Sequence, residues 1–301
     1  MTLAAVPCAV CQGTASDPVY PSTVKGDEPA TGHFGSSRVA AGHLAIVRCR
    51  SCGLLMTNPQ DDAATLEDIY RSFSDPAYDA EYADRGQEAA ERLALVARHH
   101  PAPGRLLDVG CGTGAFVCAA LERGWEAAGL DSSDWMVTRG RARCPPATFW
   151  RGALGVVNFP PQSFDVITMW NVLEHVVAPR EALRRVREWL APGGGVFLSM
   201  PNGSSLVSRL MGRRWPLLLR EHLWYFGPRT IGRLLADAGF ELIEVRSRLV
   251  RFSGARVLAR LEQDPGEMAG LSRRLSRVNL LCRLTLRVPT GEMDVVARVR
   301  S

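Results

Sequence analysis

The sequence predicts a doubly wound α/β fold with a small cysteine-rich module in front of it. An apolar strand pattern at residues 105–109 runs into a glycine turn, and an apolar helical pattern begins at Ala115. Strand-like and helix-like patterns then alternate along the chain, as they do in βαβ units with a parallel sheet. Two CxxC pairs, Cys8/Cys11 and Cys49/Cys52, precede all of these elements.

Length and composition fit a globular enzyme. A chain of 301 residues can hold one α/β domain of ordinary size and a smaller module. We find no apolar run of membrane-spanning length and no signal peptide before the first cysteines, so we expect a cytoplasmic protein. The formal net charge of +5 is modest and gives no reason to infer a nucleic-acid partner.

Residues 1–60 are interpreted as a zinc-ribbon-like module. Cys8, Cys11, Cys49 and Cys52 can supply four thiolates to one tetrahedral Zn²⁺. Such a closed site has no open coordination position, so its metal would stabilise the fold and take no part in the chemistry. His33 and His43 lie in the long loop between the pairs and are not needed as ligands. A redox role for the CxxC pairs is the alternative, and disulfides are not expected in a cytosolic chain.

Residues 61–103 are predicted to form a helical lid or linker. Apolar residues recur at helical spacing in 64–70 and 88–99. An aromatic-rich segment lies between these helices. It contains Tyr70, Phe73, Tyr78 and Tyr82, which can line a ligand pocket or simply pack the linker.

The glycine turn predicts a nucleotide-binding loop. Gly110, Gly112 and Gly114 let the backbone turn tightly and approach a ligand closely, and the following helix offers free N–H groups. The pattern Gly110-x-Gly112-x-x-Ala115 also satisfies a dinucleotide fingerprint. Asp108, two residues before the first glycine, would repel a pyrophosphate and therefore favours a different nucleoside ligand.

The next strand is predicted at 125–130 and ends at Asp131. A carboxylate about 20 residues beyond such glycines is placed to accept hydrogen bonds from ribose hydroxyls. This feature fits NAD and S-adenosylmethionine (SAM) equally well. Ser132 and Ser133 follow and can cap the next helix, while Trp135 and Met136 can cover an adenine or pack on the sheet.

The residues at 105–117 and 164–176 resemble two motifs of class I SAM-dependent methyltransferases. The second begins with the strand Phe164–Trp170 and continues through Asn171, Glu174 and His175. This resemblance implies a Rossmann-like seven-stranded methyltransferase sheet with an antiparallel last strand. It also implies that Asp108 holds the methionine amino group, that the loop around Cys111 holds its main chain, and that Asp131 holds the ribose.

The remaining cofactor contacts are carried over from the same resemblance. Ala153 and Leu154 follow the third strand at 147–150, where the family contacts adenine through backbone groups. The acidic residue common there in the family is missing, so base recognition would depend on main-chain contacts. Trp170 and Asn171 lie at the carboxyl end of the fourth strand, where a doubly wound sheet binds its ligand.

The segment Glu221–Phe226 is similar to an element found after the fifth strand in sugar C-methyltransferases of the methyltransferase type 11-23 branch. Those enzymes also carry an N-terminal four-cysteine zinc module. By position, His222 would be the general base and Glu221 its orienting carboxylate, because imidazole can accept a proton near neutral pH. A purely structural role for His222 is the alternative. His175 is either a second acceptor-site residue or a residue bonded to nearby backbone.

The rest of residues 104–301 is assigned to the methyltransferase domain. Helices are predicted at 180–190 and 230–238, and strands at 196–200, 240–245 and 293–299. Residues 246–291 form a long insert, for which we predict a basic amphipathic helix at 271–287. Its apolar face would pack on this domain or a second subunit, or else rest on an anionic membrane surface.

The sequence therefore predicts a SAM-dependent methyltransferase with structural zinc. Its expected acceptor is a small molecule, such as a sugar nucleotide or another natural-product or envelope precursor. Two alternatives remain open at this point. One is a zinc-containing RNA methyltransferase, and the other is a protein that binds SAM without catalysis or a nicotinamide reductase.

Overall fold

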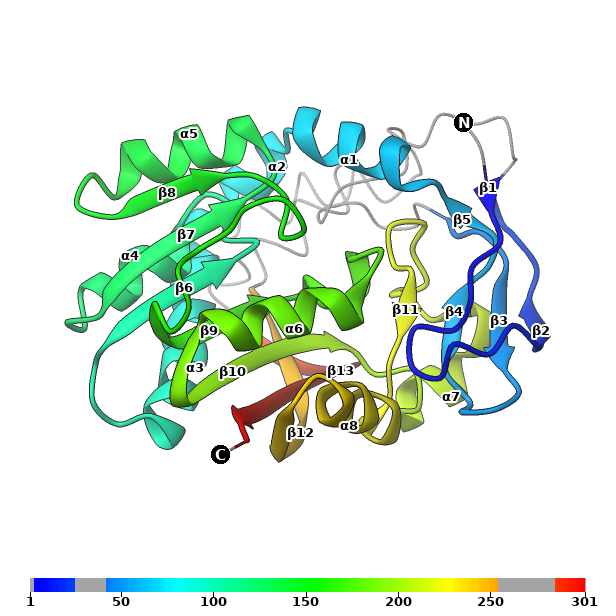
Figure 1. The fold of residues 1–301 in the computed structure, drawn as a ribbon. Coiled ribbons are helices and arrows are strands. Elements are labelled where there is room, and N and C mark those ends of the chain that lie inside the picture. Colours follow the sequence, from blue (N-terminus) through cyan, green and yellow to red (C-terminus); the bar gives the residue numbers. More distant parts are fainter. Residues whose placement is uncertain (1–2, 25–41, 254–284, 301) are drawn as a thin grey trace, which may run out of the picture.

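The computed structural model describes residues 3–24, 42–253 and 285–300. A seven-stranded sheet crosses the molecule with helices on both faces, and the N-terminal module lies at one end (Figure 1). Among the described residues, no helix is long and apolar enough to span a bilayer.

The seven-stranded sheet has the order β12-β13-β10-β9-β6-β7-β8. Its five parallel strands are β6 (Arg105–Val109), β7 (Glu126–Asp131), β8 (Thr148–Arg151), β9 (Phe164–Trp170) and β10 (Leu190–Pro201). β13 (Thr285–Val299) runs antiparallel between β10 and β12 (Phe240–Ser253). The order of the strands reverses between β6 and β9, so a ligand is expected at the carboxyl ends of these two strands.

Helices cover both faces of this sheet, which confirms the predicted doubly wound fold. One core cluster joins residues of β6 and β9 to α3 (Tyr82–His99) and α4 (Ala115–Leu121), and includes Val137 of α5 (Asp134–Arg143). The cluster on the opposite face joins the sheet to α6 (Pro179–Trp189) and α8 (Pro228–Asp237). Apolar residues on alternate positions of β6 and β9 enter the two clusters in turn, as buried strands require.

A lid segment connects the module to the sheet. It consists of α1 (Ala63–Ser72), α2 (Pro76–Ala80) and α3, and it contains both predicted linker helices. The Asp62 side chain caps the first helix by accepting a hydrogen bond from the Thr65 N–H, and the Asp75 side chain caps the second in the same way through Tyr78.

The N-terminal module forms a four-stranded antiparallel sheet with the order β11-β4-β3-β2. Three strands come from the module itself, namely β2 (Ser16–Tyr20), β3 (Ile46–Cys49) and β4 (Leu55–Thr57). The fourth strand, β11 (Trp224–Tyr225), comes from a part of the chain that is distant in the sequence, and it pairs with β4. A second small sheet pairs β1 (Leu3–Ala4) with β5 (Gln60–Asp61). Backbone hydrogen bonds of these two sheets thus link residues on both sides of residue 60, where the sequence analysis ended the module.

The last two strands are longer than predicted. Residues 246–253 and 285–291 were assigned to a helical insert, but they extend β12 and β13 in an antiparallel ladder. The prediction was wrong for these ends, because ladder pairs such as Val250 with Val288 continue the hydrogen bonding of the sheet edge. The rest of the predicted amphipathic helix, residues 271–284, lies outside the described residues, as does His33.

One short helix, two 3₁₀ turns and a disulfide complete the fold of the described residues. The 3₁₀ turn η2 (Leu173–His175) follows β9, and α7 (Leu206–Met211) and the 3₁₀ turn η3 (Gly212–Arg214) lie between β10 and β11. A disulfide joins Cys118 of α4 to Cys144 just after α5, with the Cα atoms 5.8 Å apart. The expectation of no disulfide was therefore wrong for this pair, which is close in space because the two helices are neighbours in one layer.

Candidate active site

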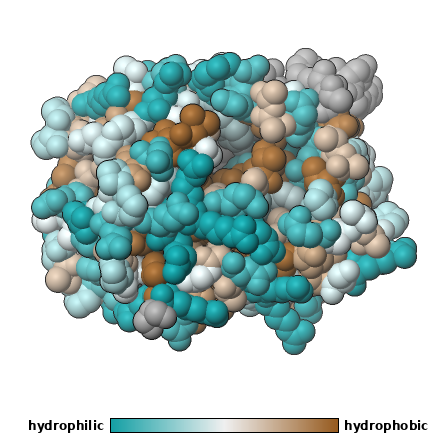
Figure 2. Space-filling model, in the orientation of Figure 1, coloured by the Kyte–Doolittle hydropathy of each residue, from teal (hydrophilic) through white to brown (hydrophobic). Residues whose placement is uncertain are grey.

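A single cavity of about 1000 Å³ lies at the carboxyl ends of β6, β7 and β9. The lid segment covers it from one side, and the segments after β8 and β10 close the other. The space-filling view shows hydrophobic side chains gathered around a recess near the centre of the molecule (Figure 2). This volume is at the upper end for pockets that hold one drug-sized ligand, so there is room for a donor and an acceptor together.

Two glycines of the glycine loop line the cavity, where their lack of a side chain lets other groups come close to the backbone. Gly110 and Gly112 have φ angles of +68° and +53°, which disfavour any side chain. A Cβ atom at Gly112 would come within 2.5 Å of the Tyr78 hydroxyl. Gly114 differs, because it does not line the cavity and a Cβ there would meet the ring of Phe149 at 2.9 Å. Its role in the structure is helix–strand packing.

Asp108 is a buried carboxyl group on the cavity wall. Only 2% of the residue is exposed, and its Oδ1 accepts a hydrogen bond of 2.6 Å from the Thr168 hydroxyl. Burial raises the pKa of Asp108 to about 7, although the Thr168 hydrogen bond and the charge of Arg92 oppose this shift. A cationic group in the cavity would stabilise the ionised form of this carboxyl group.

Asp131 is already bonded to the loop that it faces. Its two carboxylate oxygens accept backbone hydrogen bonds of 2.9 Å, one from the Gly112 N–H and one from the Ser133 N–H. Each carboxylate oxygen has two lone pairs, so one on each oxygen is left for a ligand hydroxyl. Asp131 thus joins the ends of β6 and β7 and still points acceptor atoms at the cavity.

Most of the other predicted cofactor residues line the cavity. Cys111, Ser132, Ala153, Leu154 and Asn171 all do so, together with Trp170. Asn171 adopts the left-handed conformation with φ of +57°, a region that Asn tolerates better than most residues. Of the Trp135–Met136 pair, only Met136 lines the cavity, because Trp135 stacks under the Arg139 guanidinium with 4.3 Å between the group and the ring centre.

Arg92 of α3 is a cavity residue that the sequence analysis missed. Its guanidinium carbon lies 5.0 Å from the Trp170 ring centre, and its Nη2 donates to Asn171 Oδ1 at 3.3 Å. Its Nε is buried and has no hydrogen-bond partner in the described structure. Helical periodicity placed Arg92 on α3, but only the docking of α3 onto β9 shows that it faces the cavity.

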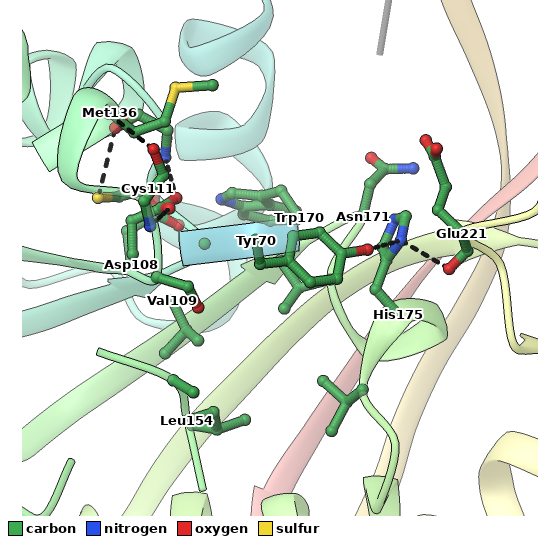
Figure 3. A pocket seen from close by; sticks show the side chains of 18 of the residues that line it. Tyr70, Asp108, Val109, Cys111, Met136, Leu154, Trp170, Asn171, His175 and Glu221 are labelled. Atoms are coloured by element: carbon green, nitrogen blue, oxygen red, sulfur yellow. Dashed lines mark hydrogen bonds between the residues drawn. The ribbon is translucent and has the colours of Figure 1, made fainter. Parts of the chain in front are cut away.

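The other end of the cavity brings together residues from three distant segments. Tyr70 comes from α1, His175 from η2, and Glu221 with His222 from the connection before β11, and all four line the cavity. The Tyr70 hydroxyl lies 2.9 Å from His175 Nδ1, and the two ring centres of His175 and His222 are 4.8 Å apart. Figure 3 shows Tyr70 pointing at His175, while the Glu221 carboxylate extends away from that ring.

Backbone carbonyl groups set the orientation of both histidine rings. His222 Nδ1 lies 2.8 Å from the Leu217 carbonyl oxygen, and His175 Nδ1 lies 3.0 Å from the Glu221 carbonyl oxygen. A carbonyl oxygen can only accept, so the contact of His222 places the proton on Nδ1 and leaves a lone pair on Nε2. His175 Nδ1 also faces the Tyr70 hydroxyl, which can donate or accept. The group that orients His222 through Nδ1 is thus Leu217, and an orienting role for the Glu221 carboxylate stays a prediction.

Burial favours the uncharged forms of His175, His222 and Glu174. It lowers the pKa of His222 to about 4 and that of His175 well below its usual value, and a second cause for His175 is the charge of His222. Burial also raises the pKa of Glu174, which lies beside His175, to about 8. The two imidazoles are therefore neutral at pH 7, the form that can accept a proton.

The four predicted metal ligands meet in the module. One Sγ atom from each of Cys8, Cys11, Cys49 and Cys52 lies within 4.8 Å of the other three. The Cys8–Cys52 and Cys11–Cys49 pairs are 3.4 Å apart between sulfur atoms. A Zn²⁺ tetrahedron with Zn–S bonds of about 2.3 Å has sulfur–sulfur edges of roughly 3.8 Å, so this cluster fits such an ion.

Comparison with known proteins supports the prediction of the family. Residues 79–245 match the sequence profile of a methyltransferase domain. The chain is 28% identical over 167 residues to a ubiquinone biosynthesis O-methyltransferase of Nitrosospira multiformis, covering 51% of this chain and 70% of the relative. It is 33% identical to a trans-aconitate 2-methyltransferase of Acidovorax ebreus, covering 56% of this chain and 66% of the relative.

A solved structure shows the same fold. A protein of Galdieria sulphuraria described as a sarcosine dimethylglycine methyltransferase superposes with a TM-score of 0.51 at 16% identity, over 70% of this chain and 85% of its own. The glycine loop, the order of the seven strands and the profile match over more than half of the chain all indicate a methyltransferase domain. The chain belongs to the methyltransferase family and is a SAM-dependent enzyme.

Proposed function

We propose that this enzyme transfers the methyl group of SAM to a small polar acceptor held between His175 and His222. One observation carries the proposal most strongly. A single cavity joins a polar nucleoside end, formed by Asp108, Asp131 and the glycine loop, to an acceptor end that contains two neutral imidazoles.

The cofactor end would bind SAM through groups that match its charges. Asp108 would pair with the ammonium group, and Asp131 would accept hydrogen bonds from the ribose hydroxyls. Ser132, Ala153 and Leu154 line the part of the cavity where adenine would lie. The guanidinium of Arg92 lines the same cavity, its charge acts on Asp108, and it is suited to the SAM carboxylate.

At the acceptor end, His222 would accept the proton that the acceptor loses. In this step the acceptor oxygen or carbon forms a bond to the methyl carbon, the carbon–sulfur bond breaks, and the electron pair stays on sulfur. The sulfonium already activates the methyl group, so alignment of the reactants and removal of one proton are what the protein supplies. Glu221, His175 and Tyr70 would hold the acceptor beside His222.

The class of acceptor is inferred from the lining of the cavity and from relatives. Tyr70, Glu221 and Glu292 add hydrogen-bonding groups to the two histidines, as a hydroxylated acceptor requires. Of the two relatives described above, one is named for ubiquinone biosynthesis and the other for trans-aconitate, and both names indicate small-molecule acceptors. The similarity of Glu221–Phe226 to sugar C-methyltransferases makes a sugar nucleotide our first candidate.

We further propose that Cys8, Cys11, Cys49 and Cys52 hold one structural Zn²⁺. The donor set is four thiolates, which leaves no position for a substrate. Such an ion would stabilise the two knuckle turns, in which Gln12 and Gly53 both adopt a positive φ just after the second cysteine of each pair.

Calorimetry with separate ligands tests the proposed function. The purified chain should bind SAM and S-adenosylhomocysteine, and NADH should give no heat of binding. Release of S-adenosylhomocysteine should then be screened against sugar nucleotides, catechols and hydroxy acids. Binding of NADH in place of SAM would overturn the proposal. SAM binding without turnover by any acceptor class would leave only the binding function.

A further inference from the structure

We propose that Thr57, Gln60 and Asp61, which we call the module edge, are positioning residues for His222. His222 lies in the loop of residues 217–223. In this proposal, contacts with the cysteine-rich module fix the position of that loop in the cavity. This inference rests on the proposed function, because it takes His222 as the group that accepts the proton.

The first link is made by the backbone. β11 begins two residues after His222 and pairs with β4 of the module, Trp224 opposite Met56 and Tyr225 opposite Leu55. The ladder continues one residue further, because the Thr57 N–H donates to the Leu223 carbonyl oxygen at 3.0 Å. The 217–223 loop therefore ends as an added strand of the module sheet.

The second link acts on His222 itself. The Thr57 hydroxyl donates a hydrogen bond of 2.7 Å to the His222 carbonyl oxygen, and Thr57 is fully buried. The Gln60 side-chain amide donates to the neighbouring Leu223 carbonyl oxygen at 3.4 Å. A buried carbonyl group that loses its donor pays a desolvation penalty, so these contacts favour one position of the loop.

The third link is a buried ion pair. Arg220 donates to both carboxylate oxygens of Asp61, from Nε at 2.9 Å and from Nη2 at 2.8 Å, and both side chains are 1% exposed. A bidentate pair fixes direction as well as distance. Removal of one partner would leave a buried charge, so the pair determines where residue 220 lies, two positions before His222.

The opposite side of the loop is held by the segment after β9. The Leu223 N–H donates to the Glu174 carbonyl oxygen at 2.8 Å, and Trp224 Nε1 donates to the Val176 carbonyl oxygen at 2.8 Å. The loop is thus clamped between η2 and the module edge. Misplacement of a proton-accepting group by about 1 Å can cost on the order of 100-fold in rate, so this clamp has a direct effect on turnover.

Thr57→Val tests the inference with little change in volume. With Thr57→Val, kcat for the best acceptor of the panel should fall by roughly 10- to 100-fold. The Kd for SAM should stay within about twofold, because no group of the cofactor end is altered. Thr57→Ser keeps the hydroxyl and should restore most of the rate. Thr23→Val changes a threonine of the same module that contacts His43 and should have no effect on kcat.

A spectroscopic measurement separates positioning from general stability. The chain has six histidines, so ¹⁵N-histidine-labelled protein should give resolved ring spectra, with His222 assigned from His222→Ala. Wild type should show His222 as the Nδ1–H tautomer, as its contact with the Leu217 carbonyl requires. Thr57→Val and Asp61→Asn should shift this signal toward a mixture of tautomers, and Thr57→Ser should not.

Each result bears on a different part of the proposal. If the His222 signal and kcat are the same in Thr57→Val and Asp61→Asn as in wild type, the module edge does not position His222. If Asp61→Asn fails to fold, Thr57→Val still decides the matter. If wild type itself binds no SAM, the proposed function fails, whereas the His222 spectra still report whether the module edge sets the ring.

Discussion

The two ends of the cavity are built in different ways. At the cofactor end, Asp108, the glycine loop and Asp131 each lie on or just after a strand of the parallel sheet. Their hydrogen bonds run within that sheet edge, from Gly112 and Ser133 to Asp131 and from Thr168 to Asp108. At the acceptor end, Tyr70, His175 and His222 come from segments more than 40 residues apart, and they meet where α1, η2 and the 217–223 loop dock against one another. One end is thus formed within a single sheet, and the other depends on how separate segments dock.

His222→Ala should have the largest effect on kcat, and it should change catalysis without changing SAM binding. Loss of a positioned proton acceptor costs roughly 10²- to 10⁴-fold in rate, so kcat should fall by that factor. The Kd for SAM should remain within about twofold of wild type in calorimetry. His99→Ala, which removes a ring paired with Glu244 far from the cavity, is the control. An unchanged kcat for His222→Ala would mean that the proton is taken up elsewhere.

Asp108→Ala should affect the cofactor end, where it should weaken SAM binding. Loss of a buried carboxylate that pairs with the SAM ammonium group should weaken SAM binding on the order of 100-fold. Asp134→Ala, at an exposed carboxylate on the same side of the sheet, should leave the Kd unchanged. Calorimetry measures both constants. Equal affinities of the two variants would remove Asp108 from the site.

Metal removal should affect the acceptor end more than the cofactor end. Elemental analysis should give about one zinc per chain, and a chelator should lower the melting temperature by about 10 °C if roughly 3 kcal/mol is lost. SAM affinity measured at 20 °C should change by less than about twofold, because the backbone hydrogen bonds described for the glycine loop go to β7, to α4 and to the loop itself. An iron–sulfur absorption spectrum, or a metal-free protein of equal stability, would refute the proposed zinc site.

The pH dependence of SAM binding should reveal Asp108. Burial raises its pKa to about 7, so the carboxyl group is protonated below that pH and cannot pair with an ammonium group. The Kd for SAM should therefore rise by up to about tenfold per pH unit as the pH falls from 7 to 5. The ammonium group itself stays charged in this range. Asp108→Asn should bind weakly at every pH and show a flat profile, and a sloping profile in that variant would assign the titration to another group.

Sequence patterns predicted the features that depend on neighbours in the chain. Strand-turn-helix order located the glycine loop that lines the cavity, and helical spacing located α1 and α3. The four cysteines were also grouped correctly, because the ligand chemistry of CxxC pairs is independent of the loop between them. The extended ladder of β12 and β13 was missed, since pairing between distant strands leaves only a weak local signal.

The missing parts of the site share one physical cause. Arg92 and Thr57 have no motif around them, and their roles arise from how α3 and β4 dock against β9 and β11. Cys118 and Cys144, which are 26 positions apart in the sequence, likewise meet through the packing of two helices. Contacts of this kind become visible only when the fold has brought the segments together.

A crystal structure with S-adenosylhomocysteine would test the central claim most directly. Our account predicts the ribose at Asp131, the amino group at Asp108, and the sulfur atom facing the space between His175 and His222. A cavity filled instead by the Trp170 ring, or the ligand bound with its sulfur turned away from both histidines, would contradict it.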